Sequence, residues 1–392
     1  MEQILQKISG IKKVDSRFMK SLAFIFFCLV LSACNDSKPN SSSQVSAQAS
    51  DQTHFSIKDS IGITIIEVVE PFLNSSKVER YVLFKKVQGK PKGIKADVFI
   101  ELPIERIGVN STTHLGYLKA LGKEDKIVAA SNTELFYDKG FQKRIQEGRV
   151  TQLGNRSMNT ELVIESELDV LFTFAIDAAS YSAVERLRAL GQPVILISEF
   201  MESDPLEKAQ WLKVFAAFFD ETTEQKANAH LQKVQQRYDS IKNISMLSSF
   251  LPKVAIGLPW KGTWYVSGGE SYQAKLINDA SARYIWKDHE QSASVPLDIE
   301  TAISKGMQAD FWINPGRLAT AQDVKNSNTV FEQFSSFKNQ TIYTNYKRSN
   351  KLGANDYWEM GVVRPDLILS DLFSIFHHNA SDSLNFYQSI FE

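Results

Sequence analysis

Glu161-Leu-Val-Ile-Glu-Ser-Glu-Leu-Asp-Val-Leu-Phe172 decides the fold of this chain, because its pattern occurs a second time. The second copy is Glu300-Thr-Ala-Ile-Ser-Lys-Gly-Met-Gln-Ala-Asp-Phe-Trp-Ile313. Each copy predicts a short helix headed by a glutamate, a turn at an aspartate (Asp169 or Asp310) and a buried strand. Such a repeat indicates two similar lobes, and two-lobed proteins usually bind a ligand in the cleft between them. Taken alone, the two glutamates also fit ordinary first-turn positions favoured by the helix dipole.

The residues around each copy alternate between strand and helix patterns. In the first region, strands are predicted at 107–109, 127–130, 169–174 and 193–197, and helices at 111–121 and 184–191. In the second region, strands are predicted at 253–257, 263–266, 311–313 and 341–344, and helices at 274–280 and 364–376. This alternation is typical of parallel sheets built from βαβ units. The predicted fold is α/β, with two lobes of the same kind.

A long helical pattern from Leu206 to Met246 separates the two regions. Its apolar residues recur at steps of three or four and share one face: Ala227, Leu231, Val234, Tyr238 and Ile241. The pattern fits a surface helix packed on a sheet, and it also fits a rigid strut between two lobes. Its position between two α/β regions favours the strut.

The N-terminus predicts a lipoprotein signal. A basic start at Met19-Lys20 precedes the apolar run Leu22–Leu31, which is too short to span a bilayer comfortably. Leu31-Ser-Ala-Cys34 is a lipobox, so we expect Cys34 to carry lipid on the extracytoplasmic side of a membrane. Met19 is an alternative start, because residues 1–18 are long and polar for the beginning of a signal peptide.

We expect six parts along the chain. They are a signal peptide and lipobox (1–34), a flexible tether rich in Ser, Asn, Gln and Ala (35–54), an N-terminal strand pair (55–92), an N-terminal α/β lobe (93–203), a bridging helix (204–250) and a C-terminal α/β lobe (251–392). The sequence does not predict a role for the strand pair.

Cysteine usage and charge exclude several classes of protein. The only cysteines are Cys28, which leaves with the signal, and Cys34, so the body has no disulfide and no thiol nucleophile. Of 44 basic and 45 acidic residues, residues 1–33 hold five and two, which leaves 39 and 43. This mild acidity favours neither a nucleic-acid partner nor a polybasic lipid-binding patch.

Signatures of catalysis and of metal binding are scarce. The sequence lacks a nucleophile elbow, a P-loop and a dinucleotide fingerprint. None of its histidines has the spacing of a metal-binding helix: His54, His114, His230, His289, His377 and His378. Ser111-Thr-Thr-His114 fits a nucleophile and base only loosely. It better fits a polar helix N-terminus at the end of a strand, where α/β folds bind ligands.

Large aromatic residues gather in the second lobe. Trp260, Trp264, Tyr357 and Trp358 lie in or beside predicted turns, where amphipathic rings often contact a ligand. Trp312 lies inside a predicted strand, which favours a role in the core.

The order of motifs resembles the substrate-binding proteins of ABC importers for metal chelates, namely cobalamin, haem and iron–siderophore complexes. The first lobe contributes Pro103-Ile-Glu-Arg-Ile-Gly-Val-Asn-Ser-Thr-Thr-His-Leu-Gly-Tyr-Leu-Lys-Ala-Leu-Gly122 and Asn159-Thr-Glu161. The second lobe contributes Gly-x-Trp264-Tyr-Val-x-Gly-Gly and Arg364-Pro-Asp-x-x-Leu-x-Asp371, which resemble a lipoprotein branch common in Bacteroidetes. The similarity covers about residues 93–377.

The resemblance implies a class III periplasmic binding protein, with a single long helix bridging the lobes and a metal chelate held between them. It implies that Glu161 and Glu300 dock into arginine pockets of an ABC permease. We expect ligand contacts from these residues: Ser111, Thr112, Thr113, His114, Trp260, Trp264, Tyr265, Arg317, Tyr357 and Trp358. We expect no catalytic residue, cofactor or bound metal, and a monomer. A capture lipoprotein without a permease and a chelate-processing enzyme remain alternatives.

Overall fold

The structure is a computed structural model that describes residues 53–155, 157–377 and 384–391. These residues belong to the compact unit Gln52–Glu392. The expected signal peptide, Cys34 and tether residues 35–52 lie outside the described residues, as does His378.

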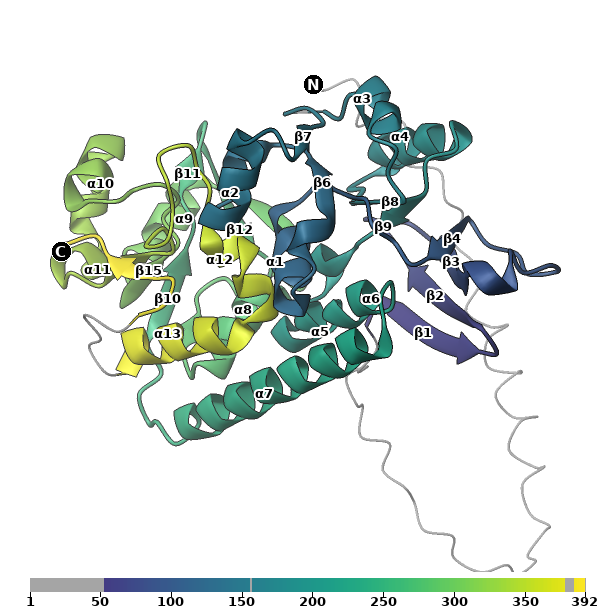
Figure 1. Ribbon diagram of the computed structural model, residues 1–392. Helices are drawn as coiled ribbons and strands as arrows, with labels where there is room; N and C mark the ends of the chain where they lie inside the picture. The colour runs from purple at the N-terminus through teal and green to yellow at the C-terminus, as the bar shows by residue number, and fades with distance from the viewer. Residues whose placement is uncertain (1–52, 156, 378–383, 392) are drawn as a thin grey trace, which may run out of the picture. The chain divides into compact units, whose positions relative to one another are not determined.

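The described chain begins with an extension sheet of four strands in the order β1-β2-β3-β4 (Figure 1). Its elements are β1 (Phe55–Ser60), β2 (Ile63–Val69), β3 (Val78–Lys85), η1 (Lys86–Gln88) and β4 (Val98–Leu102). Strands β1 to β3 are antiparallel, whereas β4 runs parallel to β3 with Val98 opposite Tyr81. The sequence predicts a strand pair over 55–92 and a further strand at 97–102 that it assigns to the N-terminal lobe, whereas the structure adds β1 and joins all four strands in one sheet. Strand β4 joins this sheet because Val98 and Ile100 are buried on the same face of the sheet as Tyr81.

The extension sheet is joined to the N-terminal lobe by buried polar contacts. The Tyr81 hydroxyl accepts a 3.0 Å hydrogen bond from the backbone N–H of Leu196. The carboxylate of Glu79, which is 1% exposed, lies 2.7 Å from Arg188 and accepts a 2.6 Å hydrogen bond from the Tyr181 hydroxyl. The extension therefore covers an edge strand of the next sheet, whose backbone groups need partners.

The N-terminal lobe contains a fully parallel sheet in the order β7-β6-β5-β8-β9. Its elements are β5 (Ile107–Val109), α1 (Thr112–Leu121), η2 (Glu124–Lys126), β6 (Ile127–Ala130), η3 (Thr133–Leu135), α2 (Lys139–Gln146), β7 (Thr151–Gln152), α3 (Thr160–Glu165), β8 (Val170–Thr173), α4 (Ala178–Ala189), β9 (Val194–Leu196) and η4 (Glu199–Met201). Each expected strand and helix of this lobe is present. Strands β5 and β6 have the predicted bounds, β8 and β9 are shorter, and α4 begins six residues earlier than predicted.

The connection between the lobes consists of three helices, α5 (Pro205–Gln210), α6 (Leu212–Ala216) and α7 (Glu221–Ser245). The single helix predicted over 206–246 is therefore too long, although α7 runs for 25 residues. The Asp220 side chain begins α7 by accepting a 2.9 Å hydrogen bond from the N–H of Thr223. Helix α7 buries the apolar face expected from the sequence.

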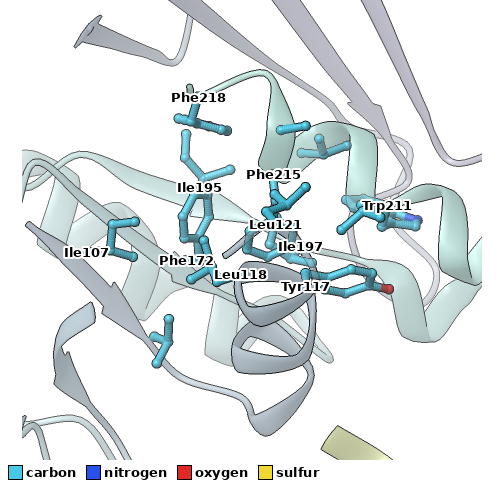
Figure 2. Close-up of a cluster of buried hydrophobic side chains, with 14 of the residues drawn as sticks. Ile107, Tyr117, Leu118, Leu121, Phe172, Ile195, Ile197, Trp211, Phe215 and Phe218 are labelled. Carbon is cyan, nitrogen blue, oxygen red and sulfur yellow. The ribbon is translucent and has the colours of Figure 1, made fainter. Parts of the chain in front are cut away.

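The break before α7 arises because α6 packs into the core of the N-terminal lobe (Figure 2). The Phe215 ring lies 4.7 Å from the ring of Phe172 on β8 and stacks on Tyr117 of α1 at 4.9 Å. Trp211 and Phe218 are fully buried in the same cluster. A continuous helix through this region would leave some of the apolar residues between Trp211 and Phe218 exposed to water, which is unfavourable because of the hydrophobic effect.

The C-terminal lobe contains the sheet β13-β10-β15-β16-β17 and the smaller antiparallel sheet β11-β12-β14. The strands are β10 (Lys253–Ile256), β11 (Pro259–Trp260), β12 (Thr263–Ser267), β13 (Arg283–Tyr284), β14 (Ser294–Asp298), β15 (Phe311–Ile313), β16 (Ile342–Thr344) and β17 (Gln388–Ser389). The helices are α8 (Tyr272–Asp279), α9 (Ile299–Gly306), α10 (Ala321–Ser327), η5 (Thr329–Gln333), α11 (Ser335–Lys338), α12 (Asp356–Glu359), η6 (Gly361–Val363) and α13 (Pro365–His377). In the larger sheet, β17 alone is antiparallel to its neighbour.

The two copies of the repeat have the same local structure. Asp169, just before β8, accepts hydrogen bonds of 2.7 and 2.8 Å from the backbone N–H groups of Glu105 and Arg106. Asp310, just before β15, accepts one of 2.7 Å from the N–H of Lys253. Each aspartate thereby ties the start of its strand to the start of the neighbouring strand.

Candidate ligand-binding site

The candidate site is a pocket of about 200 Å³ at the carboxyl ends of β10, β15 and β16. Ligands of α/β proteins bind at this edge of a parallel sheet, where the loops after the strands converge. All of its lining comes from the C-terminal lobe: Ile256, Gly257, Tyr265, Val266, Ser267, Gln273, Ser294, Asn314, Gly316, Asn345, Tyr346 and Trp358. Tyr265 and Trp358 are the two expected ligand residues that the structure brings together here.

Strand β12 sends two neighbouring aromatic residues to opposite sides. Successive side chains of a strand alternate between its faces. Tyr265 is 47% exposed and lines the pocket, whereas Trp264 is fully buried. The Trp264 indole N–H donates a 3.1 Å hydrogen bond to the carbonyl of Ile256, and its ring stacks near Phe334. The expectation that Trp264 contacts ligand is therefore wrong for this structure, because its side chain belongs to the core.

Helix α12 separates another aromatic pair in the same way. Trp358 lies at the pocket with 42% of its surface exposed, and its ring packs edge-on at 4.7 Å against Tyr357. Tyr357 is 2% exposed and packs in turn against Phe386 and Tyr387. Tyr357 therefore supports Trp358 from the core and presents no face to a ligand, which corrects the expectation for this residue.

Polar groups of the pocket come from loops that the sequence did not single out. Asn314 follows β15 with a positive φ of 52°, a conformation that asparagine tolerates better than most residues. Its side-chain oxygen is buried and has no hydrogen-bond partner among the described residues. Gln273 accepts a 2.8 Å hydrogen bond from the Ser267 hydroxyl. Their position in the sequence could have identified two of these pocket residues, because Asn314 and Asn345 directly follow predicted strands.

The N-terminal lobe presents a polar cluster at the corresponding edge of its own sheet. Ser111 caps helix α1, and its hydroxyl lies 2.8 Å from that of Thr113. The Thr113 hydroxyl donates a 2.8 Å hydrogen bond to Glu199, which follows β9. Ser111, Thr112 and Thr113 are all partly exposed. Glu199 is a residue of this cluster that the sequence reasoning missed, and burial raises the pKa of its carboxyl.

His114 does not belong to that polar surface. Its ring is fully buried between Phe172 and Phe215, at centroid distances of 6.5 and 5.8 Å. Burial disfavours the charged imidazolium and lowers the pKa of His114 to about 3. The expectation of a ligand contact is wrong for His114, because helix α1 turns its third residue toward the sheet.

Two other expected ligand residues lie outside the pocket lining. Trp260 is 62% exposed on the hairpin between β11 and β12, where the Lys261 ammonium lies 4.5 Å from its ring centre. Arg317 is exposed, and its guanidinium lies over the backbone of Gly353. Gly353 has a φ of 102° and leaves this space free, since a Cβ there would lie 2.3 Å from the guanidinium.

Glu161 and Glu300 occupy equivalent places in the two lobes. Each is exposed and is the second residue of its helix, after the capping residues Asn159 and Asp298. Glu300 lines a shallow depression of about 590 Å³ together with Thr301, Ser304, Lys305 and Gln308. Their shared position confirms the structural repeat, while docking to a permease stays a prediction.

The described residues contain neither a cluster of metal ligands nor a membrane-spanning helix. Within residues 53–155, 157–377 and 384–391, no three His, Cys, Asp or Glu residues are grouped as a metal ion would need. In the same ranges no helix has the length and apolar character required to cross a bilayer.

Comparison with known proteins agrees with this architecture. The family model for periplasmic binding proteins matches residues 109–348. An uncharacterized lipoprotein of Methanocaldococcus jannaschii is 26% identical over 72% of this chain and 67% of its own length. A second lipoprotein of that organism is 23% identical over 95% of this chain and 99% of its own length. The resemblance to a Bacteroidetes branch stays a prediction.

Solved structures show the same fold at low sequence identity. A periplasmic haem-binding protein from Pseudomonas aeruginosa covers 73% of this chain and 98% of its own, with a TM-score of 0.55 and 15% identity. A periplasmic binding protein from Veillonella parvula covers 83% and 98%, with a TM-score of 0.57 and 11% identity. The fold is that of class III periplasmic binding proteins, two α/β lobes with a long connecting helix. With its family model matching more than half of its length, the chain belongs to the periplasmic binding protein family.

Proposed function

We propose that this protein is the substrate-binding subunit of an ABC importer and captures a metal chelate between its two lobes. An iron–siderophore or cobalamin is the preferred ligand class, with haem less favoured. The observation that carries the proposal is the pocket at the strand ends, where Tyr265 and Trp358 converge with the buried, unpaired oxygen of Asn314. Flat aromatic faces suit macrocycles and catecholates, and a buried unpaired oxygen such as that of Asn314 suits a ligand donor.

The size of the pocket supports partial insertion of the ligand. About 200 Å³ is smaller than the roughly 300–1,000 Å³ of a complete small-molecule site. One arm or ring of the chelate would therefore occupy this pocket. The rest would contact the hydroxyls of Ser111, Thr112 and Thr113, which lie at the equivalent sheet edge of the other lobe.

Delivery would use the ABC permease as partner and the membrane as anchor. Cys34 would carry the lipid, and Glu161 and Glu300 would pair with permease arginines, because charge-assisted pairs give both orientation and affinity. The homologous lipoproteins support the anchored, extracytoplasmic location. No bond of the ligand is broken in this role, so no residue is given a catalytic part.

The test is isothermal titration of the purified protein with three probes: a ferric hydroxamate siderophore, cyanocobalamin and haemin. One of them should bind, and Trp358→Ala and Tyr265→Ala should each weaken that binding about tenfold or more, since an aromatic contact contributes on the order of 1–3 kcal/mol. Phe250→Ala is the matched control, because Phe250 is an exposed aromatic that does not line this pocket.

Three outcomes separate the alternatives. Binding that persists unchanged in both variants would place the site elsewhere. No binding by any probe would overturn the chelate assignment. Mass spectrometry of the recovered ligand addresses the enzyme alternative, since a chemically altered chelate would contradict a pure binding role.

A further inference from the structure

The extension sheet ends in two aliphatic side chains that contact almost nothing. Ile61 is 103% exposed and Val87 is 90% exposed. Other exposed apolar residues of the extension are less accessible to solvent; Val78, for example, is 53% exposed. Single exposed apolar residues are common on protein surfaces, but two almost completely exposed aliphatic side chains near each other are a candidate interaction site.

Ile61 and Val87 lie at the same end of the sheet. Ile63 pairs with Phe84 in the register of β2 and β3, which brings the β1–β2 turn beside the residues that follow β3. Gly62 approaches Gln88 so closely that a Cβ on the glycine would lie 2.2 Å from that side chain. Figure 1 shows this turn and the loop after β3 protruding on the same side of the sheet. We call residues 61–62 and 85–92 the tip.

The tip is strongly basic. Its segment Lys85-Lys-Val-Gln-Gly-Lys-Pro-Lys92 holds four exposed lysines and no acidic residue. The carboxylates closest in register are Asp59, which accepts a 2.6 Å hydrogen bond from Thr64, and Glu101, which lies 3.6 Å from Lys86. The lysines outnumber these carboxylates by two to one. Aliphatic side chains surrounded by lysines match a bilayer surface with anionic headgroups. The aliphatic groups can enter the boundary of the acyl chains while the lysines bind the headgroups.

The sheet beneath the tip is held rigidly. Tyr81 and Leu83 of β3 are fully buried in the core of the N-terminal lobe, and Glu79 forms its buried ion pair with Arg188. The tip is therefore a fixed projection of the body, and its apolar residues cannot turn inward without unpairing the strands.

The tether enters this same sheet. His54, immediately before β1, donates its backbone N–H to Glu202 at 2.9 Å, and its ring nitrogen lies 3.1 Å from the same carboxylate. The Phe55 ring packs edge-on against Trp211 at 5.0 Å. The six residues of β1 then span about 20 Å to the tip. Residues 35–52, between the expected lipid and the described body, span at most about 60 Å. The tip is thus within reach of the membrane that would hold the lipid.

We propose that the tip is a second membrane contact, which inserts Ile61 and Val87 between anionic lipid headgroups while its lysines bind those headgroups. This inference rests on the membrane anchoring in the proposed function, but it needs neither the chelate nor the permease. The contact would hold the extension sheet against the bilayer and restrict the positions that the tethered body can take.

The test uses residues 34–392 with Cys34→Ser, which retains every described core cluster and carries no lipid. The protein is sedimented with vesicles of phosphatidylcholine alone or of phosphatidylcholine mixed with phosphatidylglycerol. We expect binding to the mixed vesicles that falls with added salt, and at least about tenfold weaker binding to neutral vesicles. Ile61→Ser combined with Val87→Ser should reduce binding about fivefold or more, and Lys86→Glu combined with Lys92→Glu should abolish it.

Matched controls lie at the other end of the same sheet. Val78→Ser and Lys95→Glu replace an exposed valine and an exposed lysine there, and both should leave vesicle binding unchanged. Equal binding by the tip variants and the controls would overturn the proposal, and so would equal binding to both kinds of vesicle. Concentration-dependent dimerisation that the tip substitutions abolish would assign the tip to a second copy of the chain instead. Chelate titration of the same variants should be unaffected, so failure of the membrane contact is distinguishable from failure of the proposed function.

Discussion

The carboxylate of Glu359, in the C-terminal lobe, accepts a 2.7 Å hydrogen bond from the backbone N–H of Tyr137 in the N-terminal lobe. Its other oxygen accepts a 3.0 Å hydrogen bond from the N–H of Asp138. Glu359 is fully buried, so one side chain links the two lobes without contact with water. Burial, together with the nearby carboxylates of Asp356 and Asp138, raises the pKa of Glu359 to about 7.

Protonation of Glu359 should therefore couple stability to pH. Between about pH 4.5 and 7 the folded protein holds a proton that the unfolded chain has released, so this group makes the protein less stable as pH rises. The full effect is about 3 kcal/mol. His114 acts in the opposite sense between about pH 3 and 6.5, because its folded pKa is depressed. A comparison of variants is needed to separate the two.

The free energy of unfolding of Glu359→Gln should lack this contribution to the pH dependence. Urea unfolding of the wild type and of this variant at pH 5 and pH 7.5 measures the effect. Measured relative to the wild type, the variant should be about 2–3 kcal/mol more stable at pH 7.5 than at pH 5. Glu165→Gln changes an exposed helix carboxylate and serves as the control. An identical Glu359→Gln difference at both pH values would contradict the raised pKa.

Gly116→Ala should disturb the same junction. Gly116 lies on α1 where the backbone of α12 crosses, and an added Cβ would lie 1.9 Å from the carbonyl oxygen of Glu359. Because a backbone atom blocks the space, we expect a loss of about 2–3 kcal/mol in the free energy of unfolding. Gly140→Ala, in helix α2, meets no atom closer than 3.1 Å and should be neutral or stabilising by up to about 1 kcal/mol. Thermal unfolding of the two variants compares them directly, and equal melting temperatures would refute the tight crossing.

Arg188→Met should destabilise the attachment of the extension sheet. Removing the guanidinium leaves the Glu79 carboxylate buried without its charge partner, which costs about 3–5 kcal/mol. Adding Glu79→Gln should restore part of that loss, because the remaining group is then neutral. Urea titration of the single and double variants measures both effects. A double variant no more stable than Arg188→Met would show that the ion pair is not the cause.

Combined replacement of Glu161 and Glu300 by alanine should abolish uptake of the chelate by cells while its affinity in solution stays the same. Each lost charge-assisted pair would weaken docking by about 1.5–3 kcal/mol. Glu165→Ala is the control for Glu161, because it removes an exposed carboxylate from the same helix α3. Uptake by the double variant at the wild-type rate would favour a capture lipoprotein that acts without a permease.

Local chemistry was readable from the sequence where neighbours along the chain decide the structure. The alternation of strands and helices and the apolar face of α7 follow periodic patterns within a few residues. The repeat was readable as a recurring sequence pattern, although the hydrogen bonds of Asp169 and Asp310 join segments that are distant in the chain. The family resemblance depended on the same order of motifs. Burial was not readable in this way. Trp264 and Tyr265 are adjacent in sequence and similar in chemistry, yet one packs in the core and the other lines the pocket.

The sequence by itself therefore determined the two-lobed α/β class, the repeat and the position of the connecting helix. Only the tertiary structure decided that His114, Trp264 and Tyr357 are buried, that the long connecting helix begins only after α6, and that Glu359 joins the lobes. The reason is physical. Helix and strand formation follow local hydrogen bonding and periodicity, whereas the environment of a side chain depends on which distant segment packs against it.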